Sequence, residues 1–345
     1  MESGTGTPRS TEDQPSDVAG PAEREDGRMA DVLPFPGALA AKHAGEPEAD
    51  ALYHQGQALS SAGDAAGALD HFEQALSLYR AAADQANEAA TLNEIGSVHS
   101  ESEEPSEAFE PFEQALLILR EIGDRVGEAT ALHNIGHVHH RLDDTEKALA
   151  CFRQALPIRK AVGDRAGRAV TLINIGQIHE KLGEYLPAVH HYTQALTIQK
   201  QLGDRAGEAA TLNSLAHVQD LLDNPQQAIN NYSLALPILQ ELGNRAAEAT
   251  ILNNLAVIAH KNRYLEQAQA YMNQALELVR ALGDRATEAS FTFASAIIMY
   301  KLDHPEEALT TLRGAIDLAI ETGNPDLKDM QEFREHLEKS LPTEE

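Results

Sequence analysis

The chain has 345 residues and a strongly acidic balance, with 54 Asp and Glu against 27 Lys and Arg and a formal net charge of −27. A surface of this charge repels phosphate backbones and acidic lipids, so we expect neither nucleic acid nor a membrane as a partner. The single cysteine, Cys151, excludes an internal disulfide. With no membrane-length apolar run and no signal pattern, a cytoplasmic protein is expected.

The first part of the chain differs in composition from the rest. Residues 1–28 are rich in Gly, Pro, Ser, Thr, Glu and Asp, and they offer little apolar surface to bury. We therefore predict a disordered tail over residues 1–48. Residues 29–43 are more apolar but contain Pro34 and Pro36, so this stretch is either a short docking segment or part of the tail. Met29 is a second candidate for the start of the protein.

From residue 49 the sequence repeats itself every 40 residues. Phe72-Glu73-Gln74-Ala75-Leu76 recurs as Phe112-Glu113-Gln114-Ala115-Leu116. Five looser copies follow at the same spacing, namely 152–156, 192–196, 232–236, 272–276 and 312–316. Repetition at a fixed period indicates one supersecondary unit stacked on itself.

Each unit contains two helical patterns separated by a turn. In the third unit, Leu132, Ile135 and Val138 fall on one helix face, and Asp143 is placed to cap the helix that follows. A glycine closes each unit and an Asp or Asn follows it at once, which predicts a left-handed helix end and the N-cap of the next helix. These joints are Gly123-Asp124, Gly163-Asp164, Gly203-Asp204, Gly243-Asn244, Gly283-Asp284 and Gly323-Asn324.

Small residues recur where the two helices of a unit would cross. One such position holds Gly56, Gly96, Gly136, Gly176, Ala216, Ala256 and Ala296. Small side chains allow helix axes to approach to roughly 8–10 Å. Pro111, Pro157 and Pro237 fall inside the second helical patterns, where a proline bends a helix. Residues 324–345 are predicted to form a capping helix and a short tail that close the array.

The pattern Leu92-x-x-Ile95-Gly96-x-x-His99, followed by Ala108-x-x-x-Phe112 and Ala115, resembles the tetratricopeptide repeat. The resemblance covers residues 49–323 as seven units. Their spacing exceeds the family's usual period of about 34 residues. It is similar to the longer repeats of kinesin light chain and of the LGN/Pins scaffolds. The resemblance implies an all-α fold, a right-handed superhelical solenoid of antiparallel helix pairs. It also implies that the first helices line a concave groove where partner peptides bind.

Asparagines recur on the outward positions of the first helices, although asparagine is a poor interior helix former. An amide offers both a donor and an acceptor, which match the backbone of an extended peptide, and the resemblance implies this use. The alternative is that these amides hydrogen-bond the neighbouring repeat. The candidates are Asn93, Asn134, Asn174, Asn213 and Asn254, together with His137 and His217 one turn further on.

Cations recur near the ends of the first helices, at Arg141, Lys181, Lys261 and Lys301. They either compensate the helix dipole or collect the carboxylates of an acidic peptide. At the C-terminal end, Phe293 and Ile297 occupy groove positions that are polar in earlier units. We expect this apolar cluster to bind a partner rather than to be covered by the chain's own last helix.

No motif in the sequence indicates an enzyme or a cofactor. His133, His137 and His140 share a helix face, but they lack the accompanying groups of a zinc motif, so no metal site is predicted. Cys151 has no neighbouring base that would make it a nucleophile. The sequence predicts a protein-interaction scaffold that binds a peptide in its groove. The alternative is a peptide-sensing regulator that changes shape on binding and acts on a separate effector.

Overall fold

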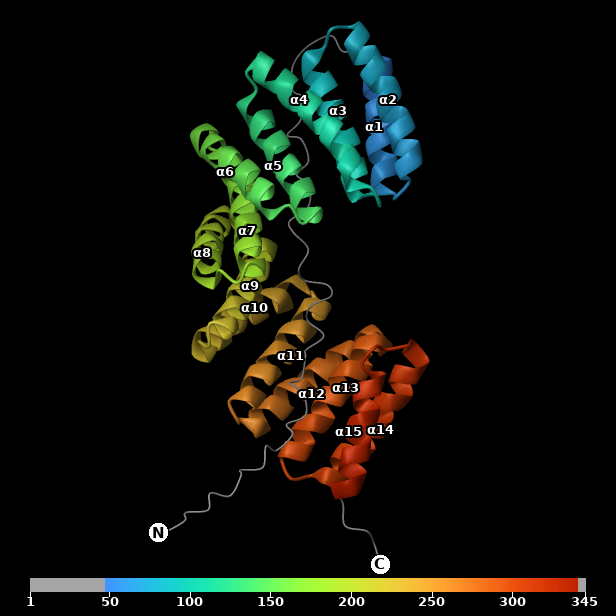
Figure 1. The fold of residues 1–345 in the computed structure, drawn as a ribbon, viewed down its shortest axis with the longest axis vertical. Helices are drawn as coiled ribbons and strands as arrows, with labels where there is room; N and C mark the ends of the chain where they lie inside the picture. The colour runs from blue at the N-terminus through green and yellow to red at the C-terminus, as the bar shows by residue number, and fades with distance from the viewer. Residues whose placement is uncertain (1–46, 341–345) are drawn as a thin grey trace, which may run out of the picture. The chain divides into compact units, whose positions relative to one another are not determined.

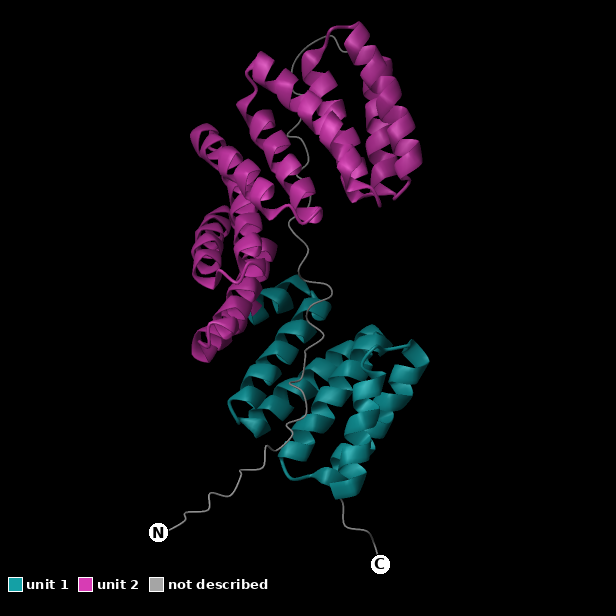
Figure 2. Cartoon of the chain, in the orientation of Figure 1, with its two compact units in different colours: residues 1–26, 236–345 teal, residues 27–235 magenta. Residues whose placement is uncertain are grey.

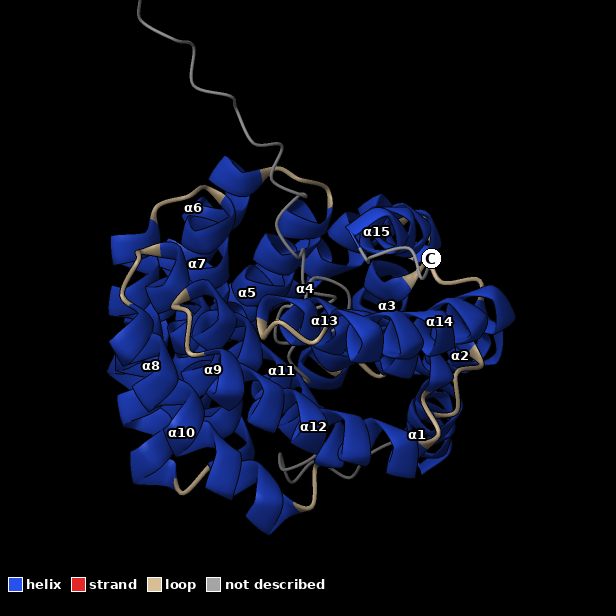
Figure 3. Cartoon of the chain, turned by 90° about the horizontal axis from the view of Figure 1, so that it is seen from below, coloured by secondary structure: helices blue, strands red, loops and turns tan. Residues whose placement is uncertain are grey.

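The computed structural model describes residues 47–340, which form helices α1–α15 and one short 3-10 helix, η3, with no strand in that range (Figures 1 and 3). Each repeat is an antiparallel pair of helices. The first helices are α1 (Pro47–Ser61), α3 (Gln85–Glu101), α5 (Arg125–Arg141), α7 (Arg165–Lys181), α9 (Arg205–Leu221), α11 (Arg245–Lys261) and α13 (Arg285–Lys301). The second helices are α2 (Ala65–Ala81), η3 (Pro105–Ala108) with α4 (Phe109–Ile122), α6 (Thr145–Val162), α8 (Tyr185–Leu202), α10 (Pro225–Leu242), α12 (Leu265–Leu282) and α14 (Pro305–Thr322). The all-α fold of stacked helix pairs is confirmed.

The joints between repeats have the predicted geometry. Gly123 ends α4 in the left-handed conformation at φ 75°, and the Asp124 carboxylate then accepts from the backbone N–H groups of Val126 and Gly127. Ala83 departs from the pattern, because it adopts φ 53° where later repeats have glycine. Within the third repeat, Asp144 caps α6 instead of Asp143, which is itself left-handed at φ 60°.

The crossing of the two helices in a repeat explains the recurring small residues. A Cβ atom added at Gly96 would lie 2.6 Å from the Phe112 ring, and one at Gly176 would lie 2.7 Å from the Tyr192 ring. Such distances are shorter than any normal carbon–carbon contact, so the first helix approaches the ring edge only because the side chain is absent.

The three prolines are accommodated in two ways. Helices α6 and α10 continue through Pro157 and Pro237. Pro111 is not inside a long helix, because the second helix of that repeat begins as η3 and α4 starts only at Phe109. Pro111 therefore lies in the first turn of α4, where a backbone N–H has no partner within the helix.

The chain divides into two compact units, with the division inside α10 between Ala235 and Leu236 (Figure 2). In the unit that contains residues 47–235, α5, α7 and α9 lie on the inner side, and α6 and α8 lie outside them (Figure 3). In the other unit, α15 (Leu327–Ser340) packs on α14 and buries Met330, Phe333 and Leu337. No helix among residues 47–340 is long and apolar enough to cross a bilayer. The predicted tail of residues 1–48 lies almost entirely outside the described residues.

Candidate functional site

Consecutive first helices are joined by polar side chains that meet at a constant offset of 41 residues. The Tyr53 hydroxyl donates to Glu94 Oε1 at 3.1 Å. Asn134 Nδ2 donates to Asn93 Oδ1 at 3.1 Å. Asn174 Nδ2 lies 3.3 Å from His133 Nε2. We call these three pairs, which link α1, α3, α5 and α7 in turn, the polar ladder.

The polar ladder corrects the prediction for three of the asparagines. Asn93, Asn134 and Asn174 each have 0% of their surface accessible, so they do not face outward. Helical periodicity places them away from the second helix of their own repeat, but the first helix of a neighbouring repeat lies against them. Their amides hydrogen-bond across repeats, which was the alternative explanation. Asn213 and Asn254 differ, because both remain partly exposed.

Burial in the ladder shifts the pKa of two of its members. Desolvation lowers the pKa of His133 well below its usual value, and the nearby Arg159 and His137 add to the effect. Desolvation also raises the pKa of Glu94, although hydrogen bonds from Gln57 and Tyr53 oppose the shift. His133 completes its contacts through Nδ1, which lies 3.2 Å from Thr171 Oγ1.

One turn beyond the ladder, a second set of first-helix side chains follows in residues 47–235, and four of the five keep part of their surface accessible. We call it the groove strip, and its members are Gln57, Ser97, His137, Gln177 and His217. The His217 side chain is 49% exposed, whereas His137 is buried and keeps 9% of its surface. All five residues are polar and none is a carboxylate. Two carboxylates border the strip: Glu94 Oε1 accepts from Gln57 Nε2 at 3.3 Å, and Glu180 Oε1 lies 3.6 Å from His217 Nε2.

Two exposed cations follow the groove strip at the ends of α5 and α7. Arg141 Nη2 donates to the Ser102 carbonyl at 3.4 Å, and Lys181 forms an ion pair with Asp143. Both contacts reach the turn of the preceding repeat, so these cations help to hold neighbouring repeats together while keeping much of their surface in solvent. In the other unit, Lys261 and Lys301 are also exposed.

The apolar cluster on α13 is covered by the chain itself. The Phe293 ring lies 6.0 Å from the Phe333 ring of α15, and the Tyr300 ring lies 5.8 Å from it. Ile297 packs against the same cluster. Phe293 and Ile297 therefore pack against the chain's own last helix, the arrangement that we did not expect, and each keeps part of its surface exposed. Binding of a partner at these two residues stays a prediction.

The remaining reactive side chains have structural surroundings. Among residues 47–340, no group of three or more His, Cys, Asp or Glu side chains is arranged to hold a metal ion. Cys151 is half-buried, and burial raises the pKa of its thiol, which disfavours the nucleophilic thiolate.

The repeat, its joints and its small-residue crossings identify the class of the protein. Tetratricopeptide repeat models match residues 47–121, 127–201, 167–241 and 249–280. The chain therefore belongs to the tetratricopeptide repeat family. Arrays of this family are protein-interaction scaffolds, and this chain has that architecture. No curated protein matches the chain.

Several solved structures are similar in fold. A STAND signal-transduction ATPase with a tetratricopeptide repeat sensor, from Pyrococcus horikoshii, has 16% identity and a TM-score of 0.71, and the match covers 78% of this chain and 41% of that one. A Rap protein complexed with Competence and Sporulation Factor has 17% identity and a TM-score of 0.52, with 77% and 78% covered. The kinesin light chain-like repeats of Podosopora anserina have 15% identity and a TM-score of 0.49, with 59% and 100% covered. At these identities, the similarity to the STAND ATPase and to the Rap protein concerns the fold alone. No inference is based on the similarity to the kinesin light chain-like repeats.

Proposed function

We propose that the chain is a scaffold that binds an extended acidic peptide along the groove strip of residues 47–235. The observation that carries the proposal is the absence of carboxylates from the five strip positions, with two cations one turn beyond them. The whole chain has a net charge of −27, yet the five strip positions hold no carboxylate, and Arg141 and Lys181 lie one turn beyond them. A peptide carboxylate would be repelled over most of the protein and would find donors here.

The chemistry of the strip suits a peptide main chain as well as its carboxylates. Gln57 and Gln177 carry amides, whose donor and acceptor groups match a peptide C=O and N–H without regard to sequence. A bound peptide would exchange with the contacts that Gln57 now makes to Tyr53 and Glu94. The imidazoles of His137 and His217 add further hydrogen-bonding groups. In this proposal the polar ladder does not touch the peptide, but fixes the spacing between the helices that present the strip. Asn213 in this unit, and Asn254, Lys261 and Lys301 in the other, remain candidates for peptide contacts.

The test is a binding measurement with a matched control. A fluorescent peptide that alternates Glu with Ala should bind the wild-type protein, and a variant with Arg141→Ala, Lys181→Ala and His217→Ala should bind at least tenfold more weakly. The control variant carries Gln74→Ala, Gln154→Ala and Gln194→Ala, which lie on the outer second helices, and it should bind as the wild type does. Equal affinity in all three proteins would exclude the groove strip as the site.

A peptide-sensing regulator is the second candidate. It is supported by two of the fold relatives, one described as a sensor and one crystallised with a factor. This candidate requires that the peptide change the shape of the protein, which small-angle X-ray scattering measures directly. A radius of gyration that stays constant at saturating peptide would favour the static scaffold.

A further inference from the structure

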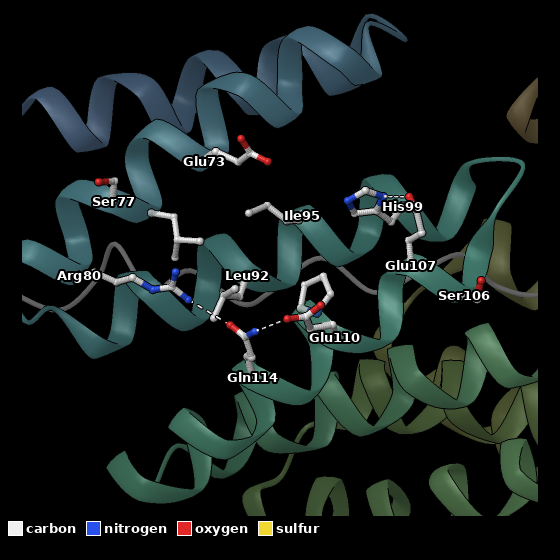
Figure 4. Close-up of a pocket in the computed structure, with 12 residues that line it drawn as sticks. Glu73, Ser77, Arg80, Leu92, Ile95, His99, Ser106, Glu107, Glu110 and Gln114 are labelled. Atoms are coloured by element: carbon white, nitrogen blue, oxygen red, sulfur yellow. Dashed lines mark hydrogen bonds and ion pairs between the residues drawn. The ribbon is translucent and has the colours of Figure 1, made fainter.

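A cleft with a volume of about 720 Å³ opens between the second helices of the first two repeats. Its walls are α2 on one side and η3 with α4 on the other, and its floor is α3 (Figure 4). The volume lies within the range of sites that bind small ligands or short peptide segments. Because second helices form the walls, the cleft is separate from the groove strip, which lies on the first helices.

The floor of the cleft is apolar. Leu92 and Ile95 of α3 form it, Leu76 of α2 and Pro111 of α4 flank it, and each is largely buried from solvent. Such a floor favours the methylene or methyl groups of a ligand, because these groups and the apolar surface that they cover are both removed from water.

Polar contacts close both ends of the cleft, one between the two walls and one between the floor and a wall. At one end, Arg80 Nη2 donates to Gln114 Oε1 at 3.0 Å, and Gln114 Nε2 donates to Glu110 Oε1 at 3.1 Å (Figure 4). At the other end, His99 Nδ1 lies 3.0 Å from Glu107 Oε2. The Arg80 guanidinium is also held by Glu88 at 2.8 Å, so the one arginine of the cleft already has an acidic partner.

Two carboxylates in the cleft are not neutralised. Glu73 on α2 and Glu110 on α4 are exposed, and neither forms an ion pair with any residue among 47–340. Glu110 accepts its hydrogen bond from the neutral amide of Gln114. The cleft therefore combines an apolar floor with negative charge on both walls.

The same helix positions one repeat later carry different chemistry. Glu113 corresponds to Glu73, but Lys147 stands where the cleft has Glu107, and Ala150 stands where it has Glu110. The pair of unneutralised carboxylates is thus a feature of the first two repeats and not a consequence of the repeat pattern.

We propose that this cleft binds an arginine or lysine side chain presented by an extended peptide of a partner protein. The methylene stem of that side chain lies on Leu92 and Ile95, and its cation lies between the Glu73 and Glu110 carboxylates. Arginine and lysine are the side chains that join an apolar stem to a cationic head, which is the combination that the cleft complements.

The experiment uses the full chain and a labelled, terminally blocked Leu-Arg-Leu peptide, with binding followed by fluorescence anisotropy. The double variant Glu73→Gln and Glu110→Gln should bind at least tenfold more weakly than the wild type. Glu113→Gln, the matched change one repeat later, should leave the affinity unchanged. Ser77→Arg keeps both carboxylates but supplies a cation from the α2 wall, and it should also abolish binding.

Three results would overturn the proposal. The first is equal binding by the double variant. The second is equal affinity of the wild type for the same peptide with citrulline in place of arginine. The third is displacement of the peptide by spermidine at an equal concentration, which would assign the cleft to free polyamines. Circular dichroism spectra and melting temperatures that match the wild type show that the variants are folded.

Discussion

Gly96 illustrates how a single missing side chain sets the distance between two helices. Replacing it with alanine should destabilise the protein by about 1–2 kcal/mol, because overpacking against Phe112 outweighs the roughly 1 kcal/mol that alanine gains in helix propensity. Urea denaturation followed by circular dichroism measures the change. Gly314 is the control, because a Cβ there meets nothing within 4 Å, and Gly314→Ala should be stabilising. Similar effects of the two substitutions would show that the crossing tolerates a methyl group.

His133 should make stability depend on pH. Its folded-state pKa lies well below 6.5, so the unfolded chain takes up a proton that the buried imidazole does not. Stability is therefore present above pH 6.5 and is lost as the pH falls through that value toward the folded pKa. The loss approaches about 1.4 kcal/mol per pH unit for one such group.

The test of this dependence is the substitution His133→Asn. Asparagine already occupies the equivalent position one repeat earlier, where Asn93 pairs with Asn134. The variant should lose about 1 kcal/mol less than the wild type between pH 7.5 and pH 5.5. Other histidines with lowered pKa, such as His191 at about 4, are common to both proteins and cancel in the comparison. Equal losses in the two proteins would assign the acid sensitivity to those other groups.

At the scale of elements, α15 packs at the end of the array in the position that the first helix of a further repeat would occupy. Phe333 keeps 9% of its surface and packs against Phe293 and Tyr300. Phe333→Ala should therefore cost about 3 kcal/mol, the usual range for truncating a buried aromatic ring. Thermal melting checks it against Glu335→Ala, an exposed change on the same helix that should be nearly neutral. A small effect of Phe333→Ala would mean that α15 detaches readily and that the α13 cluster is open to a partner.

The helices and their joints were predictable from the sequence because each depends on local rules. Left-handed glycines, Asp caps and helical spacing are read within a few residues, and the 40-residue phase locates them in every repeat. The polar ladder was not predictable in the same way. Periodicity shows that Asn134 faces away from its own second helix. Its pairing with Asn93, 41 residues earlier, depends on how the neighbouring repeat packs.

Two further features depend on contacts between elements. Arg159 is 2% exposed at a position that holds Tyr79, Leu119 or Leu239 in other repeats, and it is held by an ion pair with Asp164. Nothing in the local pattern distinguishes it from a solvated arginine. The cleft likewise joins residues of α2, α3 and α4 that lie up to 41 positions apart. The peptide-binding residues of the groove remain a prediction.

At the scale of the whole molecule, the recurrence of the polar ladder means that one repeat can be deleted and its neighbours can still form a ladder pair. Removal of residues 125–164 would bring Asn174 opposite Asn93, which recreates the amide pair that Asn134 now forms. It would also join Asp124 to Arg165, the same dipeptide that Asp124 and Arg125 form at present. Unequal recombination at the Asp-Arg joint would therefore shorten or lengthen the array by whole modules while keeping an amide pair in the polar ladder, although this deletion also removes the partners of Thr171 and Arg120. The length of peptide that such a protein can hold is then open to adjustment in evolution, one 40-residue step at a time.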